Sequence, residues 1–356
     1  MILFRELLLL AVGRREALSE APSATDWHSA WHLAKRQQLQ AVLYDAACRL
    51  PEGVRPPAAL DEVWRKSADS VAVMSELNYK LCCELDSMLK TAGVSTCVLK
   101  GLALASYYPR PASRFGGDID LWIDLGHRAF VKKARAEGWK LSDIVYQECS
   151  LSYSRSVNVD VHFRPARMYN PFRNRRLQAW FSAQAPLQFA LPSGGERPFA
   201  VPTAGFNAVY LGVHIFRHAV DGGVALRQVL DYYYVLKTLT PEERREAFDT
   251  LCSAGIGRFV GELMYVLVNL FEAPEDMLLC PPDTKSGPEL LHEIATGGSS
   301  GRRRRESREY GHSRLHRFIT RTKSQFHYLT RYPGEILWGP LYRLWHFFWR
   351  AMHGYL

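Results

Sequence analysis

The sequence lacks the cysteine spacing that metal sites and redox motifs require. It contains seven cysteines, an odd number, and no two of them are separated by two residues. Most of them lie within apolar runs. A disulfide framework and a zinc knuckle are therefore both disfavoured.

An uninterrupted apolar run long enough to span a membrane is also missing. The first ten residues are rich in leucine, but Arg5 and Glu6 interrupt them and no small-residue cleavage site follows. We therefore expect an amphipathic first helix rather than a signal peptide, and a cytoplasmic location.

The C-terminal residues 336–356 have the pattern of an amphipathic helix. One stripe of this helix is apolar and comprises Trp338, Leu341, Trp345, Phe348 and Met352, and the opposite stripe is basic and comprises Arg343, His346, Arg350 and His353. These charges disfavour a transmembrane span. The helix could lie at a membrane interface, but packing on the protein's own core is the interpretation that we favour.

Positive charge is concentrated in one segment. The formal net charge is +9, and residues 302–331 contain ten Lys or Arg against two Glu, which makes their contribution +8. The segment begins with the run Arg302–Arg305, directly after a stretch of Gly and Ser. Such a run can bind a phosphate-rich partner, either nucleic acid or anionic lipid, or it can simply be a solvated loop.

Hydrophobic periodicity divides the chain into five segments. Apolar spacings of three and four residues predict helices within residues 1–94 and 201–296. Residues 95–200 form the predicted α/β core. Its one predicted helix comprises residues 127–137, and its predicted strands comprise residues 96–99, 119–123, 139–141, 145–153 and 157–163. A basic linker, residues 297–335, and the C-terminal helix, residues 336–356, complete the chain. The predicted fold class is α+β, with a small mixed β-sheet flanked by helical regions.

Two aspartates alternate with apolar residues in one predicted strand. Because side chains two residues apart share a face, Asp118 and Asp120 project together while Ile119 and Leu121 enter the core. Neighbouring carboxylates repel one another, and a bound cation is the usual remedy. Mg²⁺ suits such a pair because it combines a few carboxylates with triphosphate oxygens. An exposed strand edge or a turn is the alternative interpretation.

A third aspartate lies in a later predicted strand. Polar and apolar residues alternate there, and Asp160 shares its face with His162. On a strand that neighbours the first, Asp160 would complete a carboxylate set for two metal ions, which lie about 3.5 to 4 Å apart in such sites. We therefore predict a site for Mg²⁺ or Mn²⁺ formed by Asp118, Asp120 and Asp160.

Together these motifs resemble the polymerase-beta-like nucleotidyltransferase superfamily. Its mark is a glycine turn at a helix start, then a strand with Asp-x-Asp, then a third Asp on a later strand. More closely, Leu-Lys-Gly at residues 99–101, Gly-Asp-Ile-Asp-Leu at 117–121 with Arg114 before it, and Val-Asp-Val-His at 159–162 are similar to a branch of uncharacterised bacterial nucleotidyltransferases.

The resemblance implies an enzyme that transfers a nucleoside monophosphate. The donor would be a nucleoside triphosphate, and the acceptor would be a hydroxyl of a small molecule, a protein or an RNA end. Asp118, Asp120 and Asp160 would hold the metal, and Asp160 would help to deprotonate the acceptor. The alternatives are a catalytically inactive binding module and an RNA-directed transferase that uses the basic segment.

Five further residues are candidates for nucleotide binding: Lys100, Gly101, Arg114, Gly117 and His162. A glycine at a helix start lets the backbone approach a triphosphate closely, and the lysine could neutralise its charge. A plain strand-to-helix turn with an exposed lysine is the alternative. The arginine either holds a phosphate or pairs with Asp118 or Asp124, and the histidine either binds substrate or orders its strand.

Four polar residues of the downstream helices have roles that the sequence leaves open. His214 and His218 have the spacing of helical metal ligands but lack the glutamate of the metalloprotease motif, so a structural or substrate-contacting role is favoured over zinc. Arg227 and Asp231 have the spacing of a helix salt bridge. His218, Arg227 and Asp231 could also reach the active cleft.

Overall fold

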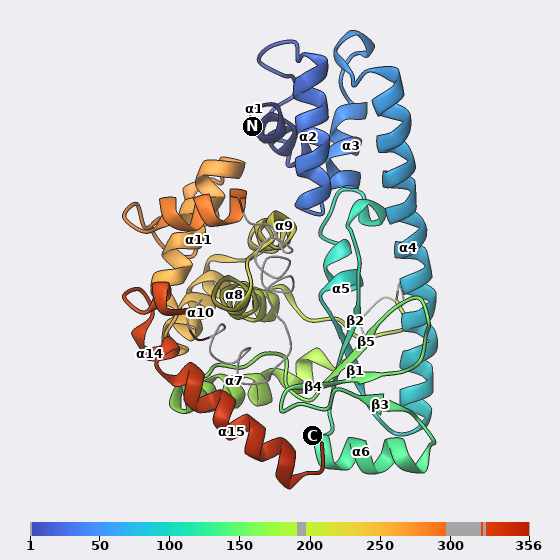
Figure 1. Cartoon of the computed structure of the whole chain (residues 1–356), viewed down its shortest axis with the longest axis vertical. Coiled ribbons are helices and arrows are strands. Elements are labelled where there is room, and N and C mark those ends of the chain that lie inside the picture. Colours follow the sequence, from blue (N-terminus) through green and yellow to red (C-terminus); the bar gives the residue numbers. More distant parts are fainter. Residues whose placement is uncertain (1, 191–196, 297–321, 323–324, 356) are drawn as a thin grey trace.

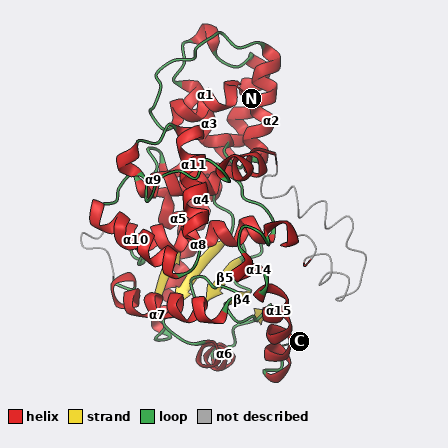
Figure 2. Cartoon of the chain, turned by 90° about the vertical axis from the view of Figure 1, so that its left-hand side faces the viewer, coloured by secondary structure: helices red, strands yellow, loops and turns green. Residues whose placement is uncertain are grey.

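The computed structural model describes residues 2–190, 197–296, 322 and 325–355. A small sheet lies between one long helix and a group of shorter helices, as Figures 1 and 2 show. The α+β fold class is therefore confirmed. The basic run Arg302–Arg305 lies outside the described residues, so its predicted binding role stays a prediction.

Four helices form the N-terminal part of the chain: α1 (Ile2–Ala11), α2 (Ala24–Arg36), α3 (Gln40–Cys48) and α4 (Ala58–Thr91). A capping box of Ser23 and Asp26 begins α2, because each side chain binds the backbone N–H of the other. The indole of Trp64 on α4 donates to the carbonyl of Gln40, 2.7 Å away, and fixes α4 against α3. Figure 1 shows α4 continuing from this bundle along the sheet.

The sheet has five strands in the order β1-β2-β5-β4-β3. Their bounds are β1 (Thr96–Leu99), β2 (Ile119–Ile123), β3 (Leu141–Ser142), β4 (Glu148–Leu151) and β5 (Val159–His162). Strands β2 and β5 are parallel, and the other neighbouring pairs are antiparallel. The predicted strands at residues 96–99 and 119–123 are confirmed with the same bounds, whereas the later three are shorter than or displaced from the predicted ranges.

The two faces of the sheet have different surroundings. On one face Ile119, Leu121 and Val161 are buried in a core that also contains residues of α4 and of α6 (His127–Ala136). On the other face the Trp122 ring stacks on that of Phe206, with centroids 5.4 Å apart. The polar residues that alternate with the apolar ones therefore point away from α4 and toward the C-terminal half of the chain.

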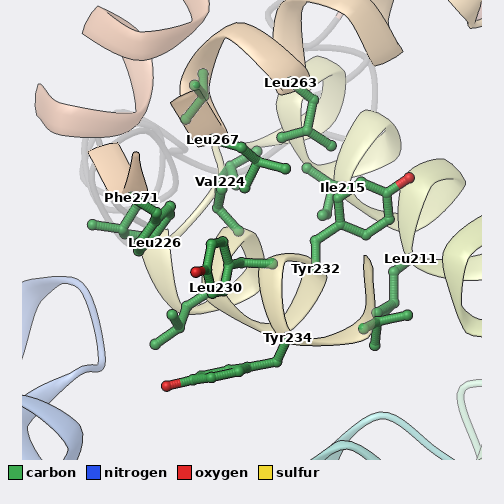
Figure 3. Close-up of a cluster of buried hydrophobic side chains, with 14 of the residues drawn as sticks. Leu211, Ile215, Val224, Leu226, Leu230, Tyr232, Tyr234, Leu263, Leu267 and Phe271 are labelled. Atoms are coloured by element: carbon green, nitrogen blue, oxygen red, sulfur yellow. The ribbon is translucent and has the colours of Figure 1, made fainter. Parts of the chain in front are cut away.

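Helices dominate the C-terminal half. The long ones are α7 (Pro171–Gln188), α8 (Ala204–Asp221), α9 (Leu226–Leu236), α10 (Pro241–Ser253), α11 (Gly257–Phe271) and α15 (Trp338–Met352), and residues 287–296 are also helical. The short elements are η1 (Glu52–Val54), α5 (Gly101–Ala105), η2 (Pro111–Ser113), η3 (Glu275–Met277), η4 (Phe326–Tyr328) and α14 (Pro333–Ile336). Figure 3 shows how apolar side chains of α8, α9 and α11 meet in the larger core.

The C-terminal helix α15 contacts the rest of the protein, but most of its apolar stripe is exposed instead of packed on the core as we expected. The contact is made by Tyr342 and Trp349 together with residues of the basic stripe, while Leu341, Phe348 and Met352 of the apolar stripe are exposed. None of the helices in the described part of the chain has the length and apolar content that crossing a bilayer requires.

Candidate active site

A cleft of about 690 Å³ separates the polar face of the sheet from α8 and α9. Four of its acidic lining residues come from the sheet and the turn before it: Asp118, Asp120, Glu148 and Asp160. Asp221 of α8 and Asp231 of α9 also line it, and each of them is paired with an arginine. Its basic lining residues come from several elements: Lys100, Arg114, Arg167, His214, Arg217, His218 and Arg227. The cleft therefore has an acidic wall on the sheet side and a largely basic wall on the helical side.

The structure brings the three predicted aspartates to one wall of this cleft. In the parallel pair of β2 and β5, Asp120 lies directly beside Asp160, and neighbouring strands are about 4.8 Å apart. Asp118 precedes β2 and is exposed, and it accepts a hydrogen bond from Asn158 Nδ2 at 3.2 Å. Asp160 accepts one from Ser150 Oγ at 2.9 Å.

Asp120 is the buried centre of a charged network. Its Oδ1 lies 2.8 Å from Lys100 Nζ and 2.8 Å from His162 Nε2. Burial alone would raise the pKa of Asp120, but the Lys100 ammonium and the hydrogen bond from His162 outweigh it and hold that pKa below its usual range. The lysine predicted to be near a phosphate is therefore already paired with a carboxylate.

His162 connects two carboxylates. Its Nδ1 lies 3.2 Å from Glu148 Oε2, while its Nε2 faces Asp120. Burial alone would lower the pKa of His162, but the charge of Glu148 and the hydrogen bond to Asp120 raise it. This geometry supports the interpretation that His162 orders its strand and its neighbours, because both ring nitrogens already have partners.

The backbone turns sharply where β1 ends and α5 begins. Lys100 has φ 47° and ψ −146°, and Gly101 has φ 37°. A positive φ strains a residue with a side chain, and such strain is concentrated at functional sites. A Cβ added to Gly101 would lie 3.7 Å from the Asp118 carbonyl oxygen. The glycine thus allows this turn and brings it next to the aspartate loop.

Arg114 is held by a different aspartate from those predicted. Its Nε and Nη2 donate to the two carboxylate oxygens of Asp231, each at 2.8 Å, and Tyr108 Oη donates to Oδ1 at 2.7 Å. Both charged side chains are almost fully buried. The predicted pairing with Asp118 or Asp124 is therefore wrong: Asp124 instead accepts from the backbone N–H of Ser95.

Arg227 is a guanidinium without a carboxylate partner among the described residues. Its Nη1 donates to the Phe115 carbonyl at 2.7 Å, but its buried Nε has no acceptor. Burial and the nearby Arg114 charge lower the pKa of Arg227. The helix salt bridge that its spacing to Asp231 suggested is absent from the described contacts, because Arg114 occupies both oxygens of Asp231.

Two other arginines extend the basic wall. Arg167 donates from Nη1 to Gln147 Oε1 at 2.6 Å, and its buried Nε has no acceptor among the described residues. Arg217 differs because it pairs with Asp221 and, at 2.9 Å, with Glu335. Arg167 and Arg227 are thus the arginines of this wall that could take up an anionic ligand.

The paired histidines of α8 also line the cleft. The ring centroids of His214 and His218 are 4.4 Å apart. Burial, followed by the charge of Lys100, lowers the pKa of His214 well below its usual value. In the described part of the chain no group of three His, Cys, Asp or Glu side chains is arranged to hold a metal ion. The preference for a structural or substrate-contacting role over a zinc site is consistent with this geometry.

The aspartates nevertheless have the chemistry that Mg²⁺ or Mn²⁺ prefers. The three aspartates offer hard carboxylate oxygens. Burial, followed by the charges of Asp120 and Glu148, raises the pKa of Asp160. Mg²⁺ usually takes one or two carboxylates together with substrate phosphates rather than a complete protein cage. The donor set therefore fits a metal that arrives with a triphosphate.

Some cleft residues are not among the predicted site residues. Glu148 and Ser150 lie opposite His162 and Asp160 in the antiparallel pair of β4 and β5. The alternation of polar and apolar residues in residues 148–151 was the available signal, because it places both on the face of Asp160. Arg167 lies outside any predicted element and gave no such signal. Gly117 lines the cleft as an exposed residue beside Asp118.

Comparison with known proteins identifies a family. A family model described as an uncharacterised nucleotidyltransferase matches residues 23–272. This range contains the three aspartates and the basic wall. No curated protein matches the chain at a significant level.

Proposed function

The chain belongs to the family of uncharacterised nucleotidyltransferases, and we propose that it transfers a nucleoside monophosphate from a nucleoside triphosphate to an acceptor hydroxyl in a metal-dependent reaction. The observation that carries this proposal is the convergence of Asp118, Asp120 and Asp160 on one wall of a cleft whose opposite wall has more basic than acidic side chains. A polyphosphate chain with its metal needs both kinds of wall.

Asp118, Asp120 and Asp160 are the proposed metal ligands. Mg²⁺ or Mn²⁺, when bound, would offset the negative charge of the triphosphate and of the leaving pyrophosphate. Lys100 holds the Asp120 carboxylate in place from one side and His162 holds it from the other. Asn158 and Ser150 do the same for Asp118 and Asp160.

Arg227 is the proposed phosphate ligand on the opposite wall. A desolvated guanidinium without a carboxylate partner is costly, and an incoming anion relieves that cost. Arg114 cannot serve in this way because Asp231 engages its fork. Arg114 instead fixes the start of the loop that leads to Asp118. The Phe115 carbonyl of this loop also receives hydrogen bonds from Arg227 and Arg114.

The proposed reaction is an in-line displacement. The acceptor oxygen forms a bond to the α-phosphorus, and the bond from the α-phosphorus to the oxygen that bridges to the β-phosphorus breaks. Pyrophosphate leaves with that oxygen and its electron pair. The proton of the acceptor hydroxyl passes to a carboxylate oxygen of Asp160, which the hydrogen bond from Ser150 orients.

Transfer of an α-phosphate label tests the proposal. The purified full chain is incubated with each α-labelled nucleoside triphosphate and Mg²⁺, with and without cell extract, and label transfer is measured. The Asp118→Asn/Asp120→Asn variant should lose transfer completely. Asp124→Asn is the matched control, because Asp124 is the next exposed acid of the same chain segment but does not line the cleft. Transfer that survives the double change would show that the metal site is assigned wrongly.

The same experiment separates the alternatives. Binding of a labelled nucleotide without any transfer in extract would favour an inactive binding module. The Lys100–Asp120 pair is the observation in favour of that alternative, because the lysine already neutralises one carboxylate. Loss of transfer after ribonuclease treatment of the extract would favour an RNA acceptor. The Arg302–Arg305 run, on which that version rests, lies outside the described residues.

A further inference from the structure

The C-terminal helix α15 faces the protein with its basic stripe and with the aromatic rings of Tyr342 and Trp349, not with its aliphatic side chains. Arg343 donates to Gln325 Oε1 at 2.9 Å and to Thr322 Oγ1 at 2.7 Å. His346 Nε2 accepts from the backbone N–H of Tyr146 at 3.2 Å. A helix on a water-exposed surface does the reverse, because its apolar stripe faces the core. This orientation therefore indicates that something apolar covers the outer face of α15.

The outer face of α15 is a continuous apolar surface. Seven large apolar side chains are between 42% and 75% exposed: Leu337, Leu341, Leu344, Trp345, Phe347, Phe348 and Met352. The exposed Phe172 of α7 extends the surface, because its ring centroid lies 6.2 Å from that of Trp338. A run of this size on one helix is larger than the scattered apolar residues of an ordinary surface.

The same end of the molecule is rich in positive charge. Figures 1 and 2 place α6, α7 and α15 together at one end. Within their bounds these three described helices contain nine Lys or Arg residues and no Asp or Glu: Arg128, Lys132, Lys133, Arg135, Arg173, Arg175, Arg176, Arg343 and Arg350. Arg343 and Arg350 bind other parts of the chain, and Lys133 pairs with Glu137 just after α6, so the other six are the cations that this surface offers. An occupant that fits this surface must be apolar over a strip and anionic around it.

We propose that this end of the protein docks on an anionic lipid surface, with α15 lying in the plane of the interface. A bilayer offers an apolar boundary and a sheet of anionic headgroups together. A second copy of the chain would bring like charges of α6 and α7 against one another, which opposes association. At 15 residues α15 is about 22 Å long, too short for the roughly 30 Å hydrocarbon core, so it lies on the membrane rather than across it.

Vesicle flotation of the full chain tests this docking. The two vesicle types contain phosphatidylcholine alone or phosphatidylcholine with phosphatidylserine. We expect the wild type to float with the anionic vesicles and to be released by salt, because the headgroup attraction is screened. Leu341→Glu/Phe348→Glu should lower partitioning at least tenfold. Val63→Glu/Val73→Glu, an equal change at exposed apolar residues of α4, is the matched control and should float like the wild type.

A second pair of variants tests the charge separately. Lys132→Glu/Arg135→Glu alters α6 without touching the apolar face of α15. Each cation near an anionic leaflet strengthens binding about fivefold, so loss of two should weaken it roughly 25-fold or more. Circular dichroism of each variant confirms that it folds as the wild type does.

Several results would overturn the proposal. Failure of the wild type to float with anionic vesicles is one, and equal flotation with both vesicle types is another. An equal loss in the α4 control would mean that added charge acts nonspecifically. A vesicle-free dimer that Leu341→Glu/Phe348→Glu converts to a monomer would show that a second copy covers α15. None of these results depends on whether the chain transfers nucleotides.

Discussion

Asp231→Asn is the sharpest test of how the aspartate loop is supported. The substitution keeps the size of the side chain but removes the charge that neutralises Arg114. In the wild type, Asp231 accepts hydrogen bonds from Arg114 Nε and Nη2 and from Tyr108 Oη, between 2.7 and 2.8 Å long. In the variant, the guanidinium keeps the amide oxygen of residue 231 and the Phe115 carbonyl at 3.2 Å as acceptors, but it loses one hydrogen bond and the neutralising charge.

The magnitude follows from burial. The Arg114 and Asp231 side chains are 3% and 4% exposed, so water cannot solvate the guanidinium once its partner is neutral. The cation of Arg227 nearby adds repulsion. Breaking a buried ion pair on one side costs about 3 to 5 kcal/mol in the free energy of unfolding, and we expect a loss in that range.

Urea unfolding followed by circular dichroism measures this loss. Asp69→Asn is the matched control, because Asp69 pairs with Arg65 at 3.4 Å on the exposed surface of α4. Such an exposed pair contributes about 0.3 to 0.5 kcal/mol. Replacing both partners, as in Arg114→Met/Asp231→Leu, should recover most of the lost stability, since neither member of the pair is then left as an unpaired buried charge.

A loss of less than about 1 kcal/mol for Asp231→Asn would refute this reasoning. It would mean that the Arg114 guanidinium finds another anion or reaches water, and that it is available to hold a phosphate after all. The recovery in the double variant carries equal weight. A double variant less stable than Asp231→Asn would show that shape, rather than charge pairing, dominates at this position.

Three further changes have clear expected outcomes. Gly101→Ala should lower the free energy of unfolding by about 1 kcal/mol and impair label transfer, because a positive φ disfavours alanine. Thermal unfolding measures the first effect and the transfer assay measures the second. A variant with unchanged stability and transfer would contradict this prediction. Ser150→Ala should lower kcat for transfer about tenfold or more with little change in stability, since it removes the hydrogen bond that orients the Asp160 carboxylate. Equal rates for the variant and the wild type would exclude a positioning role for Ser150. For His346, burial and then the charges of Arg167 and Arg350 lower its pKa to about 4 from 6.5. Between pH 6.5 and pH 4 the unfolded state binds more protons at His346 than the folded state does. The free energy of unfolding should therefore fall by about 1 to 2 kcal/mol as the pH drops from 6.5 to 4, after allowance for the partial exposure of His346. Urea unfolding at both pH values measures this, and His346→Gln should reduce the pH dependence.

The local part of the fold could be predicted from the sequence. Alternation of Asp118 and Asp120 with apolar residues fixes which side chains face the cleft, and the same alternation brings in Asp160. Strands β1 and β2 were predictable because each is a short β-rich segment bounded by turns. Helix α7 was not predicted, since exposed apolar residues such as Phe172 and Leu187 obscure the stripe of its buried residues and Pro186 lies inside it.

Long-range pairings could not be predicted in this way. Arg114 and Asp231 are 117 residues apart, and only tertiary packing decides that they meet. The same holds for Lys100 and Asp120, whose pairing depends on an unusual backbone turn. The orientation of α15 was also hidden, because its pattern reveals two stripes but not which of them faces the protein.

The parallel pairing of β2 and β5 makes the chemistry sensitive to the length of one short stretch. Val159, Asp160 and Val161 alternate, so a deletion or insertion of one residue within β5 would exchange a carboxylate for a methyl-bearing side chain beside Asp120 and drive the acid into the apolar core. Among natural homologues, length variation should therefore accumulate in the exposed residues 152–156 and stop at the strand.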